Sequence, residues 1–192
     1  MHRREILRLI ASAPAAVTLA WTRAESARAQ AAASGAGFEP AFFTPHEYET
    51  VRELVDLILP ADGRSGSATE AGVPEFMDFM MREETPSRQT AMRGGLAWLD
   101  ALCQKRFHRA FLDCVDSERR AVLDDIAWPE RARPEMSQGV AFFSGFRDLT
   151  AAGFWTSRMG MADLEYQGNE FVPEWKGCPE EALTRLGVRY QE

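Results

Sequence analysis

Residues 42–62 read FFTPHEYETVRELVDLILPAD, and this stretch decides the class of fold. Thr44 and Glu47 have the spacing of a capping box, and Pro45 stands at the first helical position, so the sequence predicts a helix start at Pro45. Apolar residues then recur at intervals of three and four, as one face of a helix requires. Pro60 ends the pattern. We therefore expect an amphipathic helix from Pro45 to Pro60 whose apolar face packs against other helices.

The rest of the chain continues in the same manner. Residues 60–72 contain no large apolar residue and predict a surface loop. Helices are predicted over 74–85, 87–107, 116–128, 137–153 and 179–186, with Asp116 or Ser117 as the cap of the third range, Ser137 as the cap of the fourth and Gly153 as its end. No alternating β-branched pattern indicates a strand. The prediction is an all-α fold in which residues 38–192 form one compact domain of five to six helices.

Two adjacent glycines, Gly94 and Gly95, lie inside the predicted helix 87–107. Together they destabilise a helix by about 2 kcal/mol relative to alanine. The sequence therefore predicts either a kink or a place where another backbone packs closely.

Length and composition limit the class of protein. The chain has 192 residues, of which 45% are hydrophobic, and it includes 12 Phe and 5 Trp. That length supports one domain with a real core, and the aromatic content excludes a disordered chain. Its longest apolar run is well short of the ~18 residues that a membrane-spanning helix needs.

The N-terminus has the pattern of an export signal. Arg3 and Arg4 precede a short alanine-rich apolar stretch, and residues 27–29 read ARA, which fits a signal peptidase site. The arginine pair predicts a twin-arginine signal over residues 1–29, the route of proteins that fold before export. An ordinary secretory signal and a basic amphipathic helix are the alternatives. Residues 30–37 are then a flexible lead-in, and the protein is expected in the periplasm.

Charge excludes one class of partner. Without residues 1–29 the chain keeps 17 basic and 27 acidic residues, a formal charge of −10. Such a surface repels phosphate backbones and anionic lipid headgroups on average. We therefore expect no nucleic-acid partner.

The chain has three cysteines, an odd number for an oxidising compartment. Cys103 and Cys114 are eleven positions apart and can close a small loop if the chain turns back near Phe107. Cys178 then remains, either as a buried free thiol or as a disulfide to another polypeptide.

Catalytic and cofactor motifs are missing from the sequence. It contains no G-x-G-x-x-G after a strand, no C-x-x-C-H and no C-x-x-C pair. We expect no cofactor, metal or catalytic residue in this chain. The alternative is an independent periplasmic enzyme, or a small-ligand-binding module with a concave apolar pocket, that uses His46 or His108.

Apolar residues accumulate late in the chain, where no helical period is visible. We expect an irregular segment from 154 to 175 whose aromatic side chains contact a partner protein. The candidate interface residues are Phe154, Trp155, Met159, Tyr166, Phe171, Trp175 and Cys178.

Several stretches of the chain resemble the gluconate 2-dehydrogenase subunit 3 family. They are FFTPHEYETVRELVDLILPAD, GVPEFMDFMM, RGGLAWLD, RRAVLDDIAWP, GVAFFSGFRDLTAAGFWTSRMGMADLEYQGN and FVPEWKGCP, and they cover nearly all of the chain after the leader. The resemblance implies the small subunit of a membrane-associated periplasmic dehydrogenase for sugars, sugar acids or alcohols. It also implies a large subunit that holds FAD and catalyses the reaction, and a cytochrome c subunit that carries haem.

The resemblance and the leader together predict an accessory role. The large subunit of this family commonly lacks its own export signal. The small subunit is therefore expected to carry the folded flavin subunit through the twin-arginine machinery and to stabilise it. The family supplies no catalytic residues that can be assigned to this chain.

Overall fold

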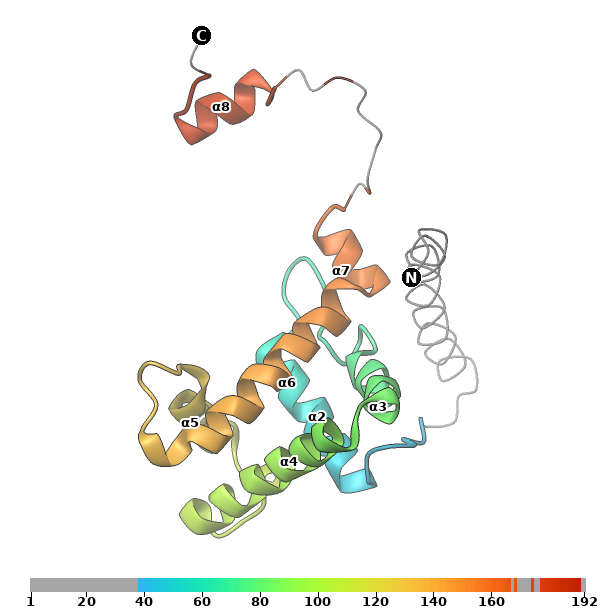
Figure 1. The fold of residues 1–192 in the computed structure, drawn as a ribbon, viewed down its shortest axis with the longest axis vertical. Helices are drawn as coiled ribbons and strands as arrows, with labels where there is room; N and C mark the ends of the chain where they lie inside the picture. The colour runs from blue at the N-terminus through green and yellow to red at the C-terminus, as the bar shows by residue number, and fades with distance from the viewer. Residues whose placement is uncertain (1–37, 167, 169–173, 175–176, 191–192) are drawn as a thin grey trace, which may run out of the picture.

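The structure is a computed structural model in which residues 38–166, 168, 174 and 177–190 are described. With the labels of Figure 1, its elements are α2 (Pro45–Ile58), α3 (Val73–Glu83), α4 (Pro86–Phe107), η1 (Phe111–Asp113), α5 (Asp116–Ala127), η2 (Pro134–Met136), α6 (Ser137–Trp155), α7 (Arg158–Asp163) and α8 (Glu180–Leu186), where η denotes a 3-10 helix. No β-strand occurs in these ranges. The predicted all-α class is confirmed.

Helix α2 begins and ends where the sequence predicts. The Thr44 hydroxyl accepts the Glu47 N–H at 3.2 Å, and the Glu47 carboxylate accepts the Thr44 N–H at 2.8 Å. This reciprocal pair satisfies two N–H groups that a helix start leaves without partners. The helix ends at Ile58, just before Pro60.

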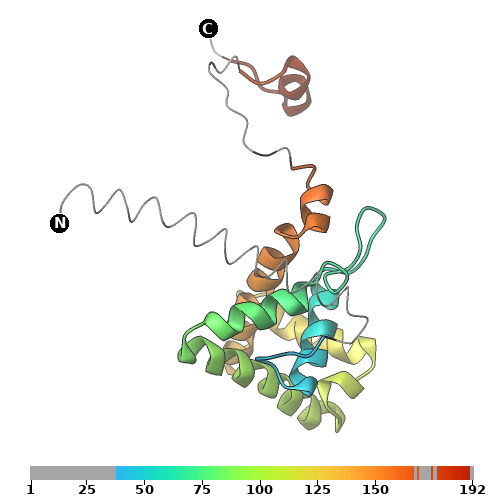
Figure 2. The ribbon, with the colours of Figure 1, turned by 90° about the vertical axis from the view of Figure 1, so that its right-hand side faces the viewer.

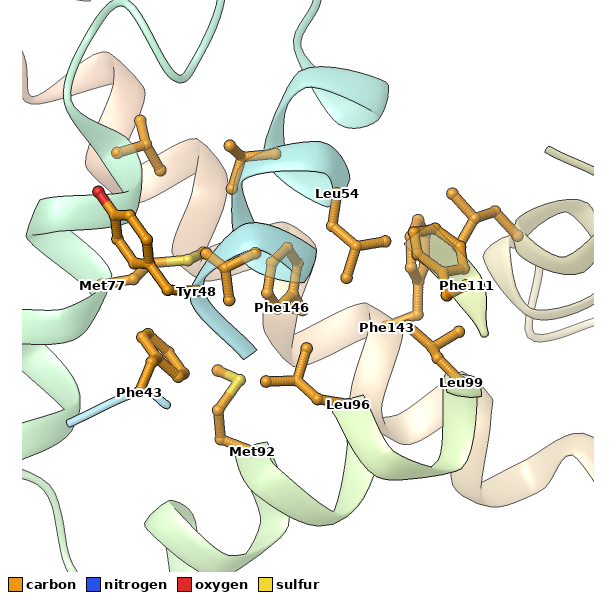
Figure 3. Close-up of a cluster of buried hydrophobic side chains, with 14 of the residues drawn as sticks. Phe43, Tyr48, Leu54, Met77, Met92, Leu96, Leu99, Phe111, Phe143 and Phe146 are labelled. Carbon is orange, nitrogen blue, oxygen red and sulfur yellow. The ribbon is translucent and has the colours of Figure 1, made fainter. Parts of the chain in front are cut away.

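Helices α2 to α7 form what we call the helical body, and α6 lies at its centre. It contacts α2, α3, α4, α5 and α7, and it crosses the body diagonally in Figure 1. Phe143 and Phe146 project from α6 into the cluster of Figure 3, where they meet Leu54 of α2 and Leu99 of α4. These side chains are at most 7% exposed. Because α6 is strongly apolar, its most favourable position is at the centre, where neighbouring helices remove it from water.

A buried carboxylate holds the segment that precedes α2. Asp78 of α3 is 2% exposed and accepts the N–H groups of Ala41, Phe42 and Phe43 at 2.9–3.0 Å. Arg93 of α4 donates to the Phe42 carbonyl and lies over the Phe42 ring, with its guanidinium carbon 4.6 Å from the centroid. Side chains of two helices thereby hold the non-helical segment before α2 in place.

Two expectations for the end of α6 were wrong. The helix does not end at Gly153 but continues to Trp155. A Cβ on Gly153 would lie 2.8 Å from Cδ1 of Phe76, so this glycine allows α3 and α6 to pack closely. In addition, α7 lies within the segment that we expected to be irregular, and the Ser157 hydroxyl caps it by accepting the Gly160 N–H at 3.0 Å.

The predicted caps of α5 and α6 were also wrong. Neither Asp116 nor Ser117 caps α5, because the residue before the helix is Val115, whose N–H donates to the Glu118 carboxylate at 3.1 Å. Ser137 is the first residue of α6, which follows η2 directly. The helices themselves were predicted at these positions.

Candidate functional site

An apolar groove lies between α4 and α6. It encloses about 730 Å³ and is lined by both helices and by the end of α3. Trp98 and Phe142 form its aromatic walls, and its rim carries the ion pair of Arg88 and Glu84, 2.9 Å apart. The remaining lining residues are Met81, Ala91, Met92, Gly94, Gly95, Gln138, Ala141, Gly145, Phe146, Asp148, Leu149 and Ala152. An apolar concavity with polar groups at its rim suits an apolar ligand or side chain.

The adjacent glycines of α4 contribute to this groove in different ways. Helix α4 continues through both of them. A Cβ on Gly95 would overlap the Phe142 ring, at 2.5 Å from Cε2 and nearer still to Cδ2. A Cβ on Gly94 would meet nothing within 4 Å. The close approach predicted at this pair is therefore made at Gly95, by a side chain and not by a backbone.

His46 has a carboxylate partner, whereas His108 lies at the end of a helix. His46 Nε2 is 2.6 Å from Asp100 Oδ2, with side chains 53% and 27% exposed. The other oxygen of Asp100 accepts the Phe111 N–H at 2.9 Å. His108 follows α4 in the left-handed region, with φ 59°.

A histidine and a carboxylate form the base and orienting group of a hydrolytic triad. Among the described residues, the hydrogen bonds of the His46 ring reach Asp100 and no hydroxyl or thiol. Asp100 also fixes η1 against α4, a structural role that needs no reaction.

The sequence did not predict the hydrogen-bonded pair of Tyr48 and Glu75. The Tyr48 hydroxyl donates to Glu75 Oε1 at 2.8 Å, and burial together with the Glu75 charge raises the pKa of Tyr48 above its ordinary value. Glu75 Oε2 is buried and has no hydrogen-bond partner within the described part of the chain. The two residues are 27 positions apart, so no local pattern could pair them.

The predicted partner-contact residues divide into two groups. Phe154 is 3% exposed and belongs to the core, which corrects its assignment to a surface, because its ring packs edge to face on Trp155 at the end of α6. Trp155 and Met159 pack against this core from half-buried positions. Tyr166 and Cys178 are exposed. Arg3, Arg4, Phe171 and Trp175, the remaining predicted site residues, lie outside the described residues.

The chain after α7 exposes apolar side chains. Leu164 is 55% and Tyr166 59% exposed, and beyond them Leu186, Val188 and Tyr190 are between 51% and 71% exposed. We call residues 164–190, as far as they are described, the C-terminal arm. Its helix α8 has no buried residue and lies away from the helical body in Figures 1 and 2.

A hydrogen bond links the two sides of α8 within this arm. The Cys178 N–H donates to the Tyr190 hydroxyl at 2.7 Å, so the tyrosine folds back across the start of α8. Gly187 ends α8 in the left-handed region, with φ 66°, as predicted.

The described residues contain neither a candidate metal site nor a membrane-spanning helix. His, Cys, Asp and Glu side chains there do not gather into groups of three or more that could hold a metal ion. None of the helices there is both long enough and apolar enough to span a membrane.

The comparisons with known proteins gave one match. No curated protein and no solved structure matches the chain significantly. Residues 45–173, which are 129 of the 192 residues, match the family described as gluconate 2-dehydrogenase subunit 3. This range runs from the first residue of α2 past the end of α7, so it contains the whole helical body. The chain belongs to the gluconate 2-dehydrogenase subunit 3 family.

Proposed function

We propose that this chain is the non-catalytic small subunit of a periplasmic FAD-dependent dehydrogenase for sugars, sugar acids or alcohols. It binds the flavin-carrying large subunit through its C-terminal arm, accompanies that subunit through twin-arginine export and stabilises it. A cytochrome c subunit completes the complex and associates it with the inner membrane. Membership of the family supports the accessory role.

The exposed C-terminal arm is the observation that carries the proposal. An isolated helix of seven residues is not stable in water. Helix α8 has this length and no buried residue, and Leu186 on it is 71% exposed. Packing against a partner would bury these side chains and stabilise the helix. The contact surface that we propose therefore comprises Tyr166, Leu186, Val188 and Tyr190, with half-buried Trp155 and Met159 at its inner edge and without Phe154.

Substitutions in the arm test this contact. With the flavin subunit co-expressed, changing Leu186 and Tyr190 to Ser should abolish co-purification and leave the helical circular dichroism of the purified chain unchanged. The matched control changes Val115 and Trp128 to Ser, which are 54% and 56% exposed on the two ends of α5. If both double variants retain the flavin subunit equally, the arm is not the contact.

Export is a separate step and needs its own test. Changing Arg3 and Arg4 to Lys should leave both this chain and the flavin subunit in the cytoplasm. Their distribution is read from cell fractions by immunoblot, with a cytoplasmic enzyme as the fractionation control. A flavin subunit that still reaches the periplasm would contradict the carrier role.

The groove favours a second function, binding of a small apolar ligand. The probe is 1-anilinonaphthalene-8-sulfonate, whose fluorescence rises in apolar sites. Gly145 lines the groove with open space at its Cβ position, so Gly145→Leu should fill the groove and reduce probe binding. Ala101→Leu, on an exposed face of α4 outside the groove, is the control. If the two variants bind equally, the groove is not the probe's site.

A further inference from the structure

Two of the three cysteines meet inside the helical body. Cys103 lies in the last turns of α4 and is 0% exposed, and Cys114 follows η1 and is 3% exposed. Both belong to the same buried cluster, and the two side chains are near enough for each thiol to shift the pKa of the other. Cys178 is exposed and lies on the arm. All three cysteines are free thiols in the structure.

The surrounding backbone fixes this meeting. Asp100, one helical turn before Cys103, accepts the Phe111 N–H at 2.9 Å. Phe111 lies three residues before Cys114, and its carbonyl accepts the Cys114 N–H at 3.2 Å. Arg119 also donates to the Phe111 carbonyl, at 3.1 Å. The connection that leaves α4 at its end is thereby brought back onto the helix, one turn from each cysteine.

We propose that Cys103 and Cys114 form an intramolecular disulfide once the chain is in an oxidising compartment. The first thiolate attacks a disulfide of the oxidant, which is either a thioredoxin-like protein or a small disulfide, and releases one reduced thiol. The second thiolate then displaces the other oxidant sulfur. One S–S bond forms in the chain, and the oxidant's bond is reduced to two thiols that take up the two protons. The compartment rests on the proposed export, whereas the pairing rests on the two buried cysteines that the Asp100–Phe111 hydrogen bond brings together.

Oxidation of the folded chain is expected to be slow. Burial raises the pKa of Cys103 to about 12, and burial also raises the pKa of Cys114. Thiolate is therefore scarce in the native state, and an oxidant reaches these atoms only when the segment around η1 opens. The bond closes a loop of about twelve residues, so reduction should lower the melting temperature by about 5–10 °C.

Peptide mapping tests the pairing directly. The full chain is refolded in a glutathione redox buffer, its free thiols are alkylated with iodoacetamide, and it is then digested with trypsin. Cleavage after Lys105 and Arg109 separates the two cysteines, so the disulfide should link the peptides 94–105 and 110–119. The same linkage is expected in chain isolated from the periplasm. This second sample decides the matter if refolding fails, while the refolded sample does not depend on export.

Two outcomes would overturn the proposal. One is a chain in which all three cysteines are alkylated after oxidation, and the other is a linkage that includes Cys178. Variants give an independent readout, because Cys103→Ala and Cys114→Ala should each abolish the effect of reductant on the melting temperature. Cys178→Ala, the matched control, should retain it. An equal response of all three variants to reductant would contradict the pairing.

Discussion

The adjacent glycines of α4 provide a sharp test of how α4 and α6 pack. Alanine in place of glycine stabilises a helix interior by about 1 kcal/mol. Gly94 is exposed and has open space at its Cβ position, so Gly94→Ala should gain that full amount. This corresponds to a rise in melting temperature of about 2–4 °C.

The same change one residue later should have the opposite sign. A Cβ on Gly95 would be 2.5 Å from Cε2 of Phe142, so the ring must leave its present position, in which its centroid is 5.6 Å from that of Phe146. Overpacking of this kind costs about 1–3 kcal/mol. After the helical gain of about 1 kcal/mol, Gly95→Ala should destabilise the chain by about 1 kcal/mol, so the two variants differ by about 2 kcal/mol.

Urea unfolding followed by far-UV circular dichroism measures both variants, with equal m-values as the check that stability alone has changed. Removing the obstructing ring tests the cause. In a Phe142→Ala background, Gly95→Ala should become stabilising, and the double-mutant cycle should give a coupling of about 2 kcal/mol. If Gly95→Ala is as stabilising as Gly94→Ala in the natural background, Phe142 does not lie on Gly95 and the packing described for the groove is wrong.

Three further predictions concern buried and partly exposed groups. Asp78→Ala should destabilise the chain by about 3 kcal/mol in urea unfolding, because the buried N–H groups of Phe42 and Phe43 and the part-buried one of Ala41 lose their acceptor, and Asp78→Asn should cost less because it keeps one oxygen. His46→Ala should change stability by less than about 1 kcal/mol and leave substrate oxidation by the assembled complex unchanged; loss of that activity would favour the enzyme alternative. Burial raises the pKa of Cys103 to about 12 and also raises the pKa of Tyr48, so the folded state holds these protons more tightly than the unfolded state does. Reduced chain should therefore keep its stability below about pH 9 and lose it progressively as the pH rises toward 12, whereas the Cys103→Ala variant should lose less; identical alkaline profiles would contradict the burial of this thiol.

Local signals in the sequence were sufficient for the helices. The bounds of α2 follow from Thr44, Glu47 and Pro60, because a cap and a stop act within one turn of the helix. The predicted loop 60–72 is exposed or half-buried except at Ala68 and Ala71, which are buried. The burial of a single alanine in a polar segment cannot be predicted, because it depends on which part of the chain packs over it.

The structural roles of individual glycines were hard to predict from the sequence. The same residue type ends α8 at Gly187, lies inside α6 at Gly153 and receives the Phe142 ring at Gly95. Only the first role depends on local backbone conformation, since φ is positive there. The other two depend on which helix packs opposite, and the sequence does not contain that information in any short window.

The groove and the hydrogen bonds of Asp78 could not be predicted for the same reason. Asp78 reads as a polar residue on an otherwise apolar helix face, and its three partners lie 35–37 residues earlier. The groove is formed by α4 and α6, whose predicted ranges begin 50 residues apart. Sites of this kind come from tertiary packing, whereas motifs come from sequence neighbours.

The position of Phe154 helps to explain why so many apolar residues late in the chain are exposed. Its ring is 3% exposed and packs on Trp155 at the end of α6, Met159 packs against the same core, and Phe154 is the last buried hydrophobic residue among those described. The exposed side chains that follow, from Leu164 to Tyr190, therefore have no position left to fill in that core. Burial of a leucine or tyrosine stabilises a protein by about 2 kcal/mol, so leaving several exposed is unfavourable unless another surface covers them. The body and the arm thus have separate requirements, and the second polypeptide that we propose at the arm would meet those of the arm.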